Sequence, residues 1–148
     1  MQTTRSVEID RPIQEVFDYT TNNVAEWSLV VVEEKVLDET PDGVGTTFHV
    51  VTEERGRQMA FDGVVTRHEP PTSHAIHLKG SSFNIDAFYR FEDLRGRTRV
   101  TQESTVDGKG LVKVMFALFG WMMKRSSCDA LDKELASLKH HAEAQGKT

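Results

Sequence analysis

Three polar residues lie in phase with apolar neighbours in segments of alternating polarity. Tyr89, Gln102 and Ser104 each fall on the apolar face of a predicted strand. Such groups need partners, because burying a polar group without a hydrogen bond is costly. They could orient a carbonyl or hydroxyl group of a bound molecule. Alternatively, they bond to backbone groups or to buried water at the end of a sheet, and the residue types leave both interpretations open.

His74 and Arg67 are two further residues that could act on a ligand. His74 lies on the apolar face of its predicted strand and could serve as a base, since imidazole titrates near neutral pH. Arg67 continues the face of Val65 and could pair with an acidic ligand group. Both lie near the Pro70-Pro71 pair, at strand ends, where we expect solvent exposure. With Tyr89, they are the candidates for catalysis.

Other histidines and carboxylates are poorly placed for chemistry. The odd spacing of His74 and His77 puts them on opposite faces of a strand, where they cannot share a metal ion. His140 and His141 are neighbours at a helix end, which is also poor ligand geometry. We therefore expect no metal and no cofactor. The remaining polar residues form the solvated face of the sheet: Gln58, Asp62, His68, Asn84, Asp86, Arg90, Glu92, Arg99, Thr101 and Glu103.

The composition is that of an ordinary globular protein. The 148 residues predict a single domain, residues 1–148, and 38% of them are hydrophobic. A net charge of −5 gives no electrostatic support for nucleic-acid binding. The single cysteine, Cys128, excludes an internal disulfide, and its place on the inner stripe of a helix favours a packing role. The longest apolar run, residues 114–123, is about half a membrane span, so we expect a cytoplasmic protein with no integral membrane span.

The periodicity changes twice along the chain. Alternation predicts a first strand, and a proline-initiated helical pattern follows at 12–19, with a second short turn at 23–27. After residue 110 the helical period returns for one long C-terminal helix, which Gly120 could bend. The strands are predicted at residues 3–9, 30–38, 45–54, 58–69, 73–79, 83–92 and 98–106.

This order predicts an α+β fold. A curved antiparallel sheet of about seven strands wraps around the C-terminal helix, because that helix is long enough to cover an apolar sheet face. Such a sheet cannot pack its centre tightly everywhere, which predicts an apolar pocket between sheet and helix. The expected ligand-binding residues are Trp27, Phe48, Met59, Phe61, Val65, Ile76, Ile85, Ala87, Tyr89, Val100, Gln102, Ser104, Met115, Phe119 and Met122.

The segment 111–123 is apolar nearly all round, so it is buried on more than one side or contacts another surface. It could line the pocket and its mouth, form a homodimer contact, or dock on a membrane surface. We favour pocket lining, with Met115, Phe119, Trp121 and Met122 facing the ligand. Ordinary packing against the sheet is the alternative.

Short motifs in order along nearly the whole chain resemble one family. The chain is similar to the polyketide cyclase/dehydrase family of the START-like (SRPBCC) superfamily, which implies a helix-grip fold and a pocket for apolar molecules. Some members of this family catalyse cyclisation, dehydration or hydrolysis. The matching pieces are Ile9 with Pro12 and Val16-Phe17; residues 22–27; Gly43-Val44-Gly45-Thr46; Gly56-Arg57; Val65 with Glu69-Pro70-Pro71; Tyr89-Arg90-Phe91; residues 96–101; and residues 131–139.

The matched residues are mostly turns and sheet positions, so they imply a fold and leave the reaction open. We expect a binding protein for a lipid-like, polyketide or aromatic molecule. An enzyme of the cyclase or dehydratase type is the first alternative, and a protein-interaction module using residues 111–123 is the second.

Overall fold

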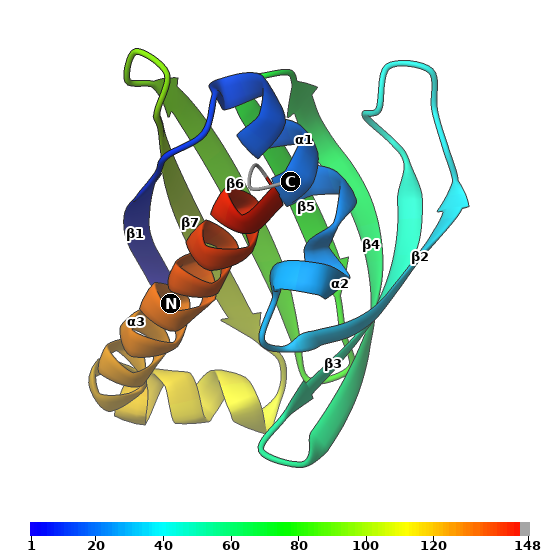
Figure 1. Cartoon of the computed structure of the whole chain (residues 1–148). Helices are drawn as coiled ribbons and strands as arrows, with labels where there is room; N and C mark the ends of the chain where they lie inside the picture. The colour runs from blue at the N-terminus through cyan, green and yellow to red at the C-terminus, as the bar shows by residue number, and fades with distance from the viewer. Residues whose placement is uncertain (146–148) are drawn as a thin grey trace.

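A computed structural model describes residues 1–145 of the chain (Figure 1). All the predicted strands and helices are present, and most boundaries agree within a few residues. The elements in chain order are β1 (Gln2–Ile9), α1 (Ile13–Asn22), α2 (Val24–Trp27), β2 (Val31–Asp38), β3 (Thr47–Glu54), β4 (Arg57–Glu69), β5 (Ser73–Lys79), β6 (Phe83–Asp93), β7 (Thr98–Gly108) and α3 (Leu111–Gln145).

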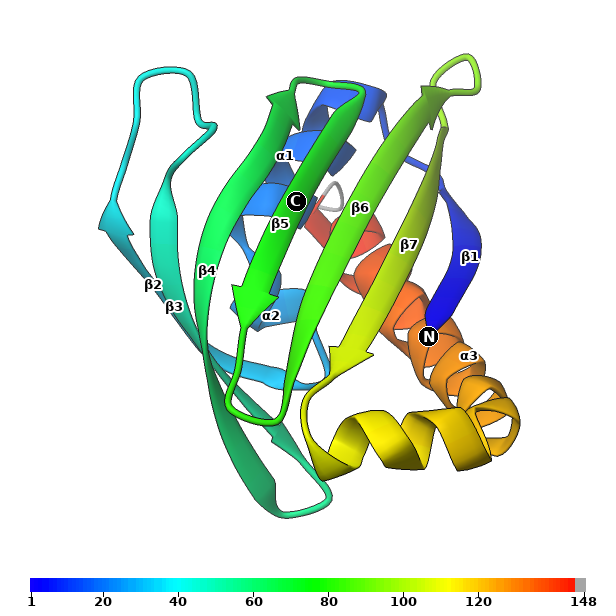
Figure 2. The same ribbon diagram turned by 180° about the vertical axis from the view of Figure 1, so that it is seen from behind.

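The seven strands form one antiparallel sheet in the order β1-β7-β6-β5-β4-β3-β2. Every strand but the first pairs with its sequence neighbour, and β1 closes the other edge against β7. Figures 1 and 2 show the sheet curving around all three helices, which lie on its concave side. This arrangement explains why apolar and polar residues alternate along the strands, since the helices cover the concave face of the sheet.

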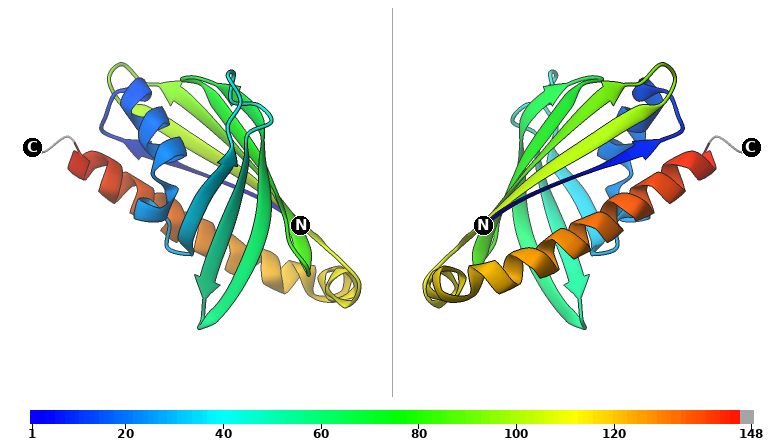
Figure 3. Two further views of the ribbon diagram at one scale, coloured as in Figure 1. Left: turned by 90° about the vertical axis from the view of Figure 1, so that its right-hand side faces the viewer. Right: turned by 90° about the vertical axis from the view of Figure 1, so that its left-hand side faces the viewer.

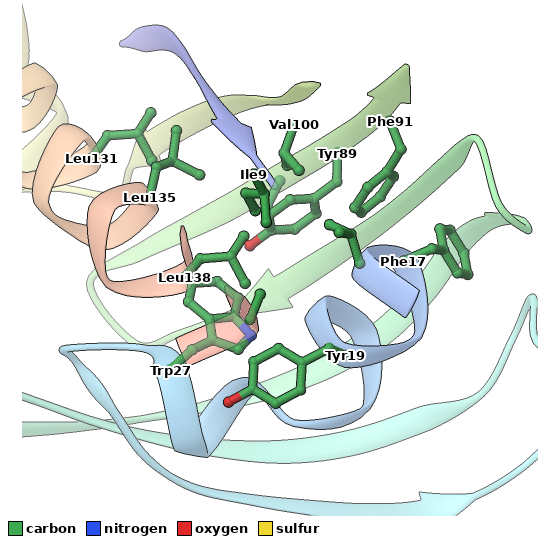
Figure 4. Close-up of a cluster of buried hydrophobic side chains, with 13 residues drawn as sticks. Ile9, Phe17, Tyr19, Trp27, Tyr89, Phe91, Val100, Leu131, Leu135 and Leu138 are labelled. Carbon is green, nitrogen blue, oxygen red and sulfur yellow. The ribbon is translucent and has the colours of Figure 1, made fainter. Parts of the chain in front are cut away.

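The main core lies between the C-terminal half of α3, the two short helices and strands β1, β6 and β7. Leu131, Leu135 and Leu138 of α3 converge there with Trp27 of α2 (Figure 4). The indole N–H of Trp27 donates to the Thr20 carbonyl at 3.2 Å, and the Ser137 hydroxyl donates to the Trp27 carbonyl at 2.6 Å. These bonds fix α2 against both α1 and α3.

The first half of α3 departs from the predicted inner stripe. The stripe holds from Leu131 to Ala142, which are buried, but Trp121 is 77% exposed. The reason lies at the end of β7, where the Lys109 backbone N–H donates to Ser82 and its ammonium group to Gly80. These bonds start α3 beyond the end of the sheet, and the helix bends before it reaches the core (yellow to orange, Figure 3).

Candidate functional site

A cavity of about 510 Å³ lies between the α1–α2 region and strands β2 to β6. The sequence predicted the pocket between the sheet and α3. That position is wrong, since none of the described residues that line the cavity belongs to α3, and the first half of α3 lies beyond the sheet. The cavity is lined by Thr20, Thr21, Asn22, Val24, Glu34, Val36, Glu39, Thr40, Pro41, Asp42, Gly43, Thr46, Phe48, Val65, His68, Pro70, His74, Ile76 and Tyr89.

The floor of the cavity is apolar and follows from the register of the sheet. Val36 of β2 pairs with Phe48 of β3, and Val65 of β4 pairs with Ile76 of β5, so the four side chains point to the same face. Tyr89 of β6 extends this floor beside His74. Phe48, Val65, Ile76 and Tyr89 are thus predicted ligand residues that the structure places on the cavity wall.

A β-bulge in β4 changes which side chains enter the cavity. Val65 pairs with Ile76, but the next pairs are Arg67 with Ala75 and His68 with His74, so Thr66 is the additional residue. The alternation therefore reverses after Val65, and His68 turns inward although it was predicted on the solvated face. Arg67 turns outward, which corrects its predicted position on the face of Val65.

Arg67 is occupied on the outer face of the sheet. Its guanidinium group pairs with Glu69 at 2.7 Å and lies 5.6 Å from the centre of the Phe88 ring. Both partners hold it away from the cavity. Of the three catalytic candidates, the structure therefore brings His74 and Tyr89 together at the cavity and separates Arg67 from them.

His68 and His74 form a bonded pair at the cavity wall. Their Nδ1 atoms are 3.1 Å apart, and the Phe17 ring packs against both, with centroid distances of 5.5 and 6.3 Å. Burial, and secondarily the neighbouring His68, lowers the pKa of His74 to about 4. His74 is thus neutral at pH 7 and partly buried, which corrects the expectation that it is solvent-exposed. A hydrogen bond between the two rings requires one Nδ1 to donate and the other to accept.

Tyr89 is a neutral hydrogen-bonding group in this wall. Burial raises the pKa of its phenol, and the carboxylates of Glu134 and Glu34 raise it further. Glu134 of α3 accepts hydrogen bonds from the Ser28 hydroxyl at 2.8 Å and from the Leu29 backbone N–H, while burial raises its pKa. Desolvation also raises the pKa of Glu34, whose side chain lines the cavity from β2.

The remaining predicted ligand residues lie around the cavity or away from it. Met59, Phe61 and Ile85 pack in a second apolar cluster beside Phe48, while Trp27, Ala87 and Val100 belong to the main core. Gln102 and Ser104 face inward across from Tyr89 and Ala87, and Gln102 Oε1 is buried without a hydrogen-bond partner within residues 1–145. Met115, Phe119 and Met122 are about half exposed on α3, which contradicts their predicted place in the pocket.

The sequence interpretation missed His68, Glu34 and the loop that closes the cavity at Gly43. One signal for the loop was present, because a glycine-rich turn at residues 43–45 indicates a backbone that other side chains cannot adopt. Gly43 has a φ of +89°, and a Cβ added there would lie 2.7 Å from the ring of His68. The backbone of the turn thus packs closely against the His68 ring.

We expect Gly43→Ala to lower the free energy of unfolding by about 2–3 kcal/mol, because it adds both backbone strain and a clash with His68. Gly56→Ala is the matched control, since Gly56 also has a positive φ (+77°) but nothing within 4 Å of an added Cβ. It should cost about 1 kcal/mol. Urea unfolding measures both, and equal losses would show that Gly43 does not hold His68 in place.

Comparisons with known proteins agree on the fold. The family model described as polyketide cyclase/dehydrase and lipid transport matches residues 1–143. No curated protein sequence matches the chain.

Three solved structures illustrate the likeness. A START superfamily protein from Mycobacterium smegmatis is 17% identical, with 97% of this chain and 98% of that chain covered and a TM-score of 0.82. A protein from Thermus thermophilus is 13% identical, with 98% and 99% covered and a TM-score of 0.81. The Zhui aromatase/cyclase from a Streptomyces species is 12% identical, with 97% and 93% covered and a TM-score of 0.75. At these identities the likeness shows the fold, which confirms the predicted helix-grip architecture.

Proposed function

Because the chain belongs to the polyketide cyclase/dehydrase and lipid transport family, we propose that it binds an apolar, non-anionic small molecule in the cavity beneath α1. The observation that carries this proposal is the composition of the wall. The apolar side chains of Phe48, Val65 and Ile76 lie beside convergent polar groups, among them His68, His74 and Tyr89. This combination is typical of small-molecule sites, and about 510 Å³ lies within their usual range of roughly 300–1,000 Å³.

The charges of the wall select against anionic ligands. Glu34, Glu39 and Asp42 line the cavity, and its lining residues, all within 1–145, include no lysine or arginine. His74 adds no positive charge at neutral pH, because its pKa is about 4. A carboxylate or sulfonate placed inside would therefore lose its hydration and meet negative charge without a paired cation. A neutral ring system with a carbonyl or hydroxyl group meets no such penalty.

A pair of fluorescent probes tests this proposal. N-phenyl-1-naphthylamine and 1-anilinonaphthalene-8-sulfonate share one ring system and differ by the sulfonate. We expect the neutral probe to bind at least about tenfold more tightly, a difference of about 1.4 kcal/mol. Glu34→Gln should narrow that difference, because it removes one of the wall's negative charges while keeping the side chain's shape.

The location of the probe is tested by a bulky residue in the cavity. Val36→Trp fills space beside Phe48 and should weaken binding of the neutral probe about tenfold or more. Val32→Trp is the matched control on the same strand, because Val32 lies outside the cavity lining and has a similar exposed fraction, 50% against 53%. Failure of the neutral probe to bind, or equal effects of the two tryptophans, would contradict the proposal.

A second candidate function is acid–base catalysis in the same cavity. It is favoured by one observation, the placement of the neutral imidazole of His74, paired with His68, next to a protonated phenol. In the tautomer in which His74 Nδ1 donates to His68, the Nε2 atom of His74 could accept a proton, and Tyr89 could donate a hydrogen bond to a carbonyl oxygen. The aromatase/cyclase among the structural neighbours supports this candidate through its fold. Conversion of a bound polyketide-like ketone, lost in His74→Gln while binding persists, would distinguish catalysis from binding.

A further inference from the structure

The first half of α3 carries an exposed apolar face that the cavity does not use. We define the apolar platform as the seven residues Leu111, Val114, Met115, Leu118, Phe119, Trp121 and Met122, each between 49% and 83% exposed. At 100° per residue, these side chains fall within one arc of about 160° on the helix. Val112, Phe116 and Met123 lie on the opposite side and are less exposed, so the platform points away from the protein.

The charges within residues 108–128 are all positive: Lys109, Lys113, Lys124 and Arg125. Asp107 and Asp129 adjoin this segment at its two ends, so its positive charge is local, within a chain whose net charge is −5. The platform segment therefore combines a broad apolar surface with basic residues.

We infer that the apolar platform docks on the surface of an anionic lipid bilayer, with its helix lying in the plane of the interface. A helix with one apolar face, a tryptophan and flanking lysines binds in this way, because its apolar side chains enter the headgroup boundary while its ammonium groups reach the lipid phosphates. Within residues 1–145, no helix is long and apolar enough to cross a membrane. The segment thus lies on the bilayer without spanning it.

Charge argues for this partner over a second copy of the chain. At 100° per residue, Arg125 falls within the arc of the platform. A symmetric dimer would place Arg125 against the same face of the other copy, where residues 108–128 offer no carboxylate, because an isologous interface repeats each contact. An anionic surface pairs with this charge. The bonds of Lys109 to Ser82 and Gly80 also hold the start of the helix beyond the sheet, away from the cavity.

Docking and ligand binding use different parts of the fold. The platform lies beside the β5–β6 turn, whereas the cavity reaches the opposite end of β4, at His68 and Pro70. A protein bound through α3 therefore keeps that end of the cavity away from the lipid. The inference does not rest on the proposed function, and each can fail without the other.

Vesicle sedimentation tests the inference directly. The full chain is mixed with phosphatidylcholine vesicles, with or without about 30% phosphatidylserine, and we expect a partition coefficient at least about tenfold higher on the anionic vesicles at low salt. Leu118→Asp should reduce that coefficient about tenfold or more. The matched control is Leu37→Asp on β2, which alters a leucine of similar exposure (54% against 63%) outside the platform.

Tryptophan emission provides a second readout. Trp121 is exposed and Trp27 is buried, so insertion should shift the emission of Trp121 to shorter wavelength, and Trp121→Phe should abolish the shift while the protein still sediments with the vesicles. Equal sedimentation of Leu118→Asp and the wild type, or no preference for anionic vesicles, would overturn the inference. A concentration-dependent mass without lipid that Leu118→Asp abolishes would identify a second copy as the partner and would overturn it too.

Discussion

Replacing Trp27 with alanine is expected to lower the free energy of unfolding by about 3–5 kcal/mol. Trp27 is 2% exposed, and its ring fills the space between α2 and the leucines of α3 (Figure 4). Alanine leaves a large void there and removes the indole N–H that donates to the Thr20 carbonyl. Because domains of this kind are stable by only about 5–15 kcal/mol, such a loss removes a large part of the total.

The chain supplies a matched control for this experiment. Trp121→Ala removes the same side chain from an exposed site, where we expect a change within about 0.5 kcal/mol. Urea unfolding followed by far-ultraviolet circular dichroism compares both variants with the wild type. A loss of similar size in the two variants would mean that the first half of α3 packs in the core, which would contradict both the bent helix and the apolar platform.

The strands were predictable because one face of the sheet is covered and the other is solvated. The alternation of β6 through Ala87, Tyr89 and Phe91 arises from that difference, and these residues are buried as predicted. Turn chemistry at Gly56 and Gly96 fixed the hairpin boundaries in the same way, because both glycines adopt a positive φ. Patterns that arise from local physics can be recognised in one sequence.

The bulge in β4 could not be predicted from the alternation of residues along the strand. Counting by twos from Val65 assigns Arg67 to the cavity and His68 to solvent, and one additional residue at Thr66 reverses both. Threonine, the residue type at position 66, is not one that marks a bulge. The reversal depends on how β4 pairs with β5, and alternation within one strand carries no information about its partner.

The prediction for the first half of α3 was wrong for a different reason. Residues 111–123 are apolar around most of the helix, so their period indicates no preferred face. Their direction is set by contacts distant in sequence, such as the hydrogen bond from Lys109 to the Gly80 carbonyl. The cavity depends on similar long-range placement, because the loop at Thr40 to Gly43 and the end of α1 have no periodic pattern to place them.

The acid sensitivity of the fold should be governed in part by His74. Burial, and to a lesser degree His68, lowers its pKa from 6.5 to about 4 in the folded state. The unfolded chain therefore binds a proton more readily than the folded protein between these two values. Stability from this group is fully present above about pH 6.5 and declines as the pH falls toward 4, with a total loss of about 3 kcal/mol.

Two carboxyl groups near the cavity act in the opposite direction. Burial raises the pKa values of Glu34 and Glu134, so the folded state binds their protons more readily, and stability from these groups increases as the pH falls. The pH dependence of the wild-type unfolding free energy combines the effect of His74 with that of the two carboxyl groups. The difference between the wild type and His74→Gln isolates the histidine, because glutamine does not titrate and can still hydrogen-bond to His68.

We therefore expect the unfolding free energy of His74→Gln to fall less steeply than that of the wild type between about pH 6.5 and 4, by roughly 1 kcal/mol per pH unit. His140→Gln, which removes an exposed imidazole near the end of α3, should retain the wild-type slope. Urea midpoints collected across this pH range give all three curves. Parallel curves for the wild type and His74→Gln would mean that His74 is hydrated in the folded protein, which would contradict its burial in the cavity wall.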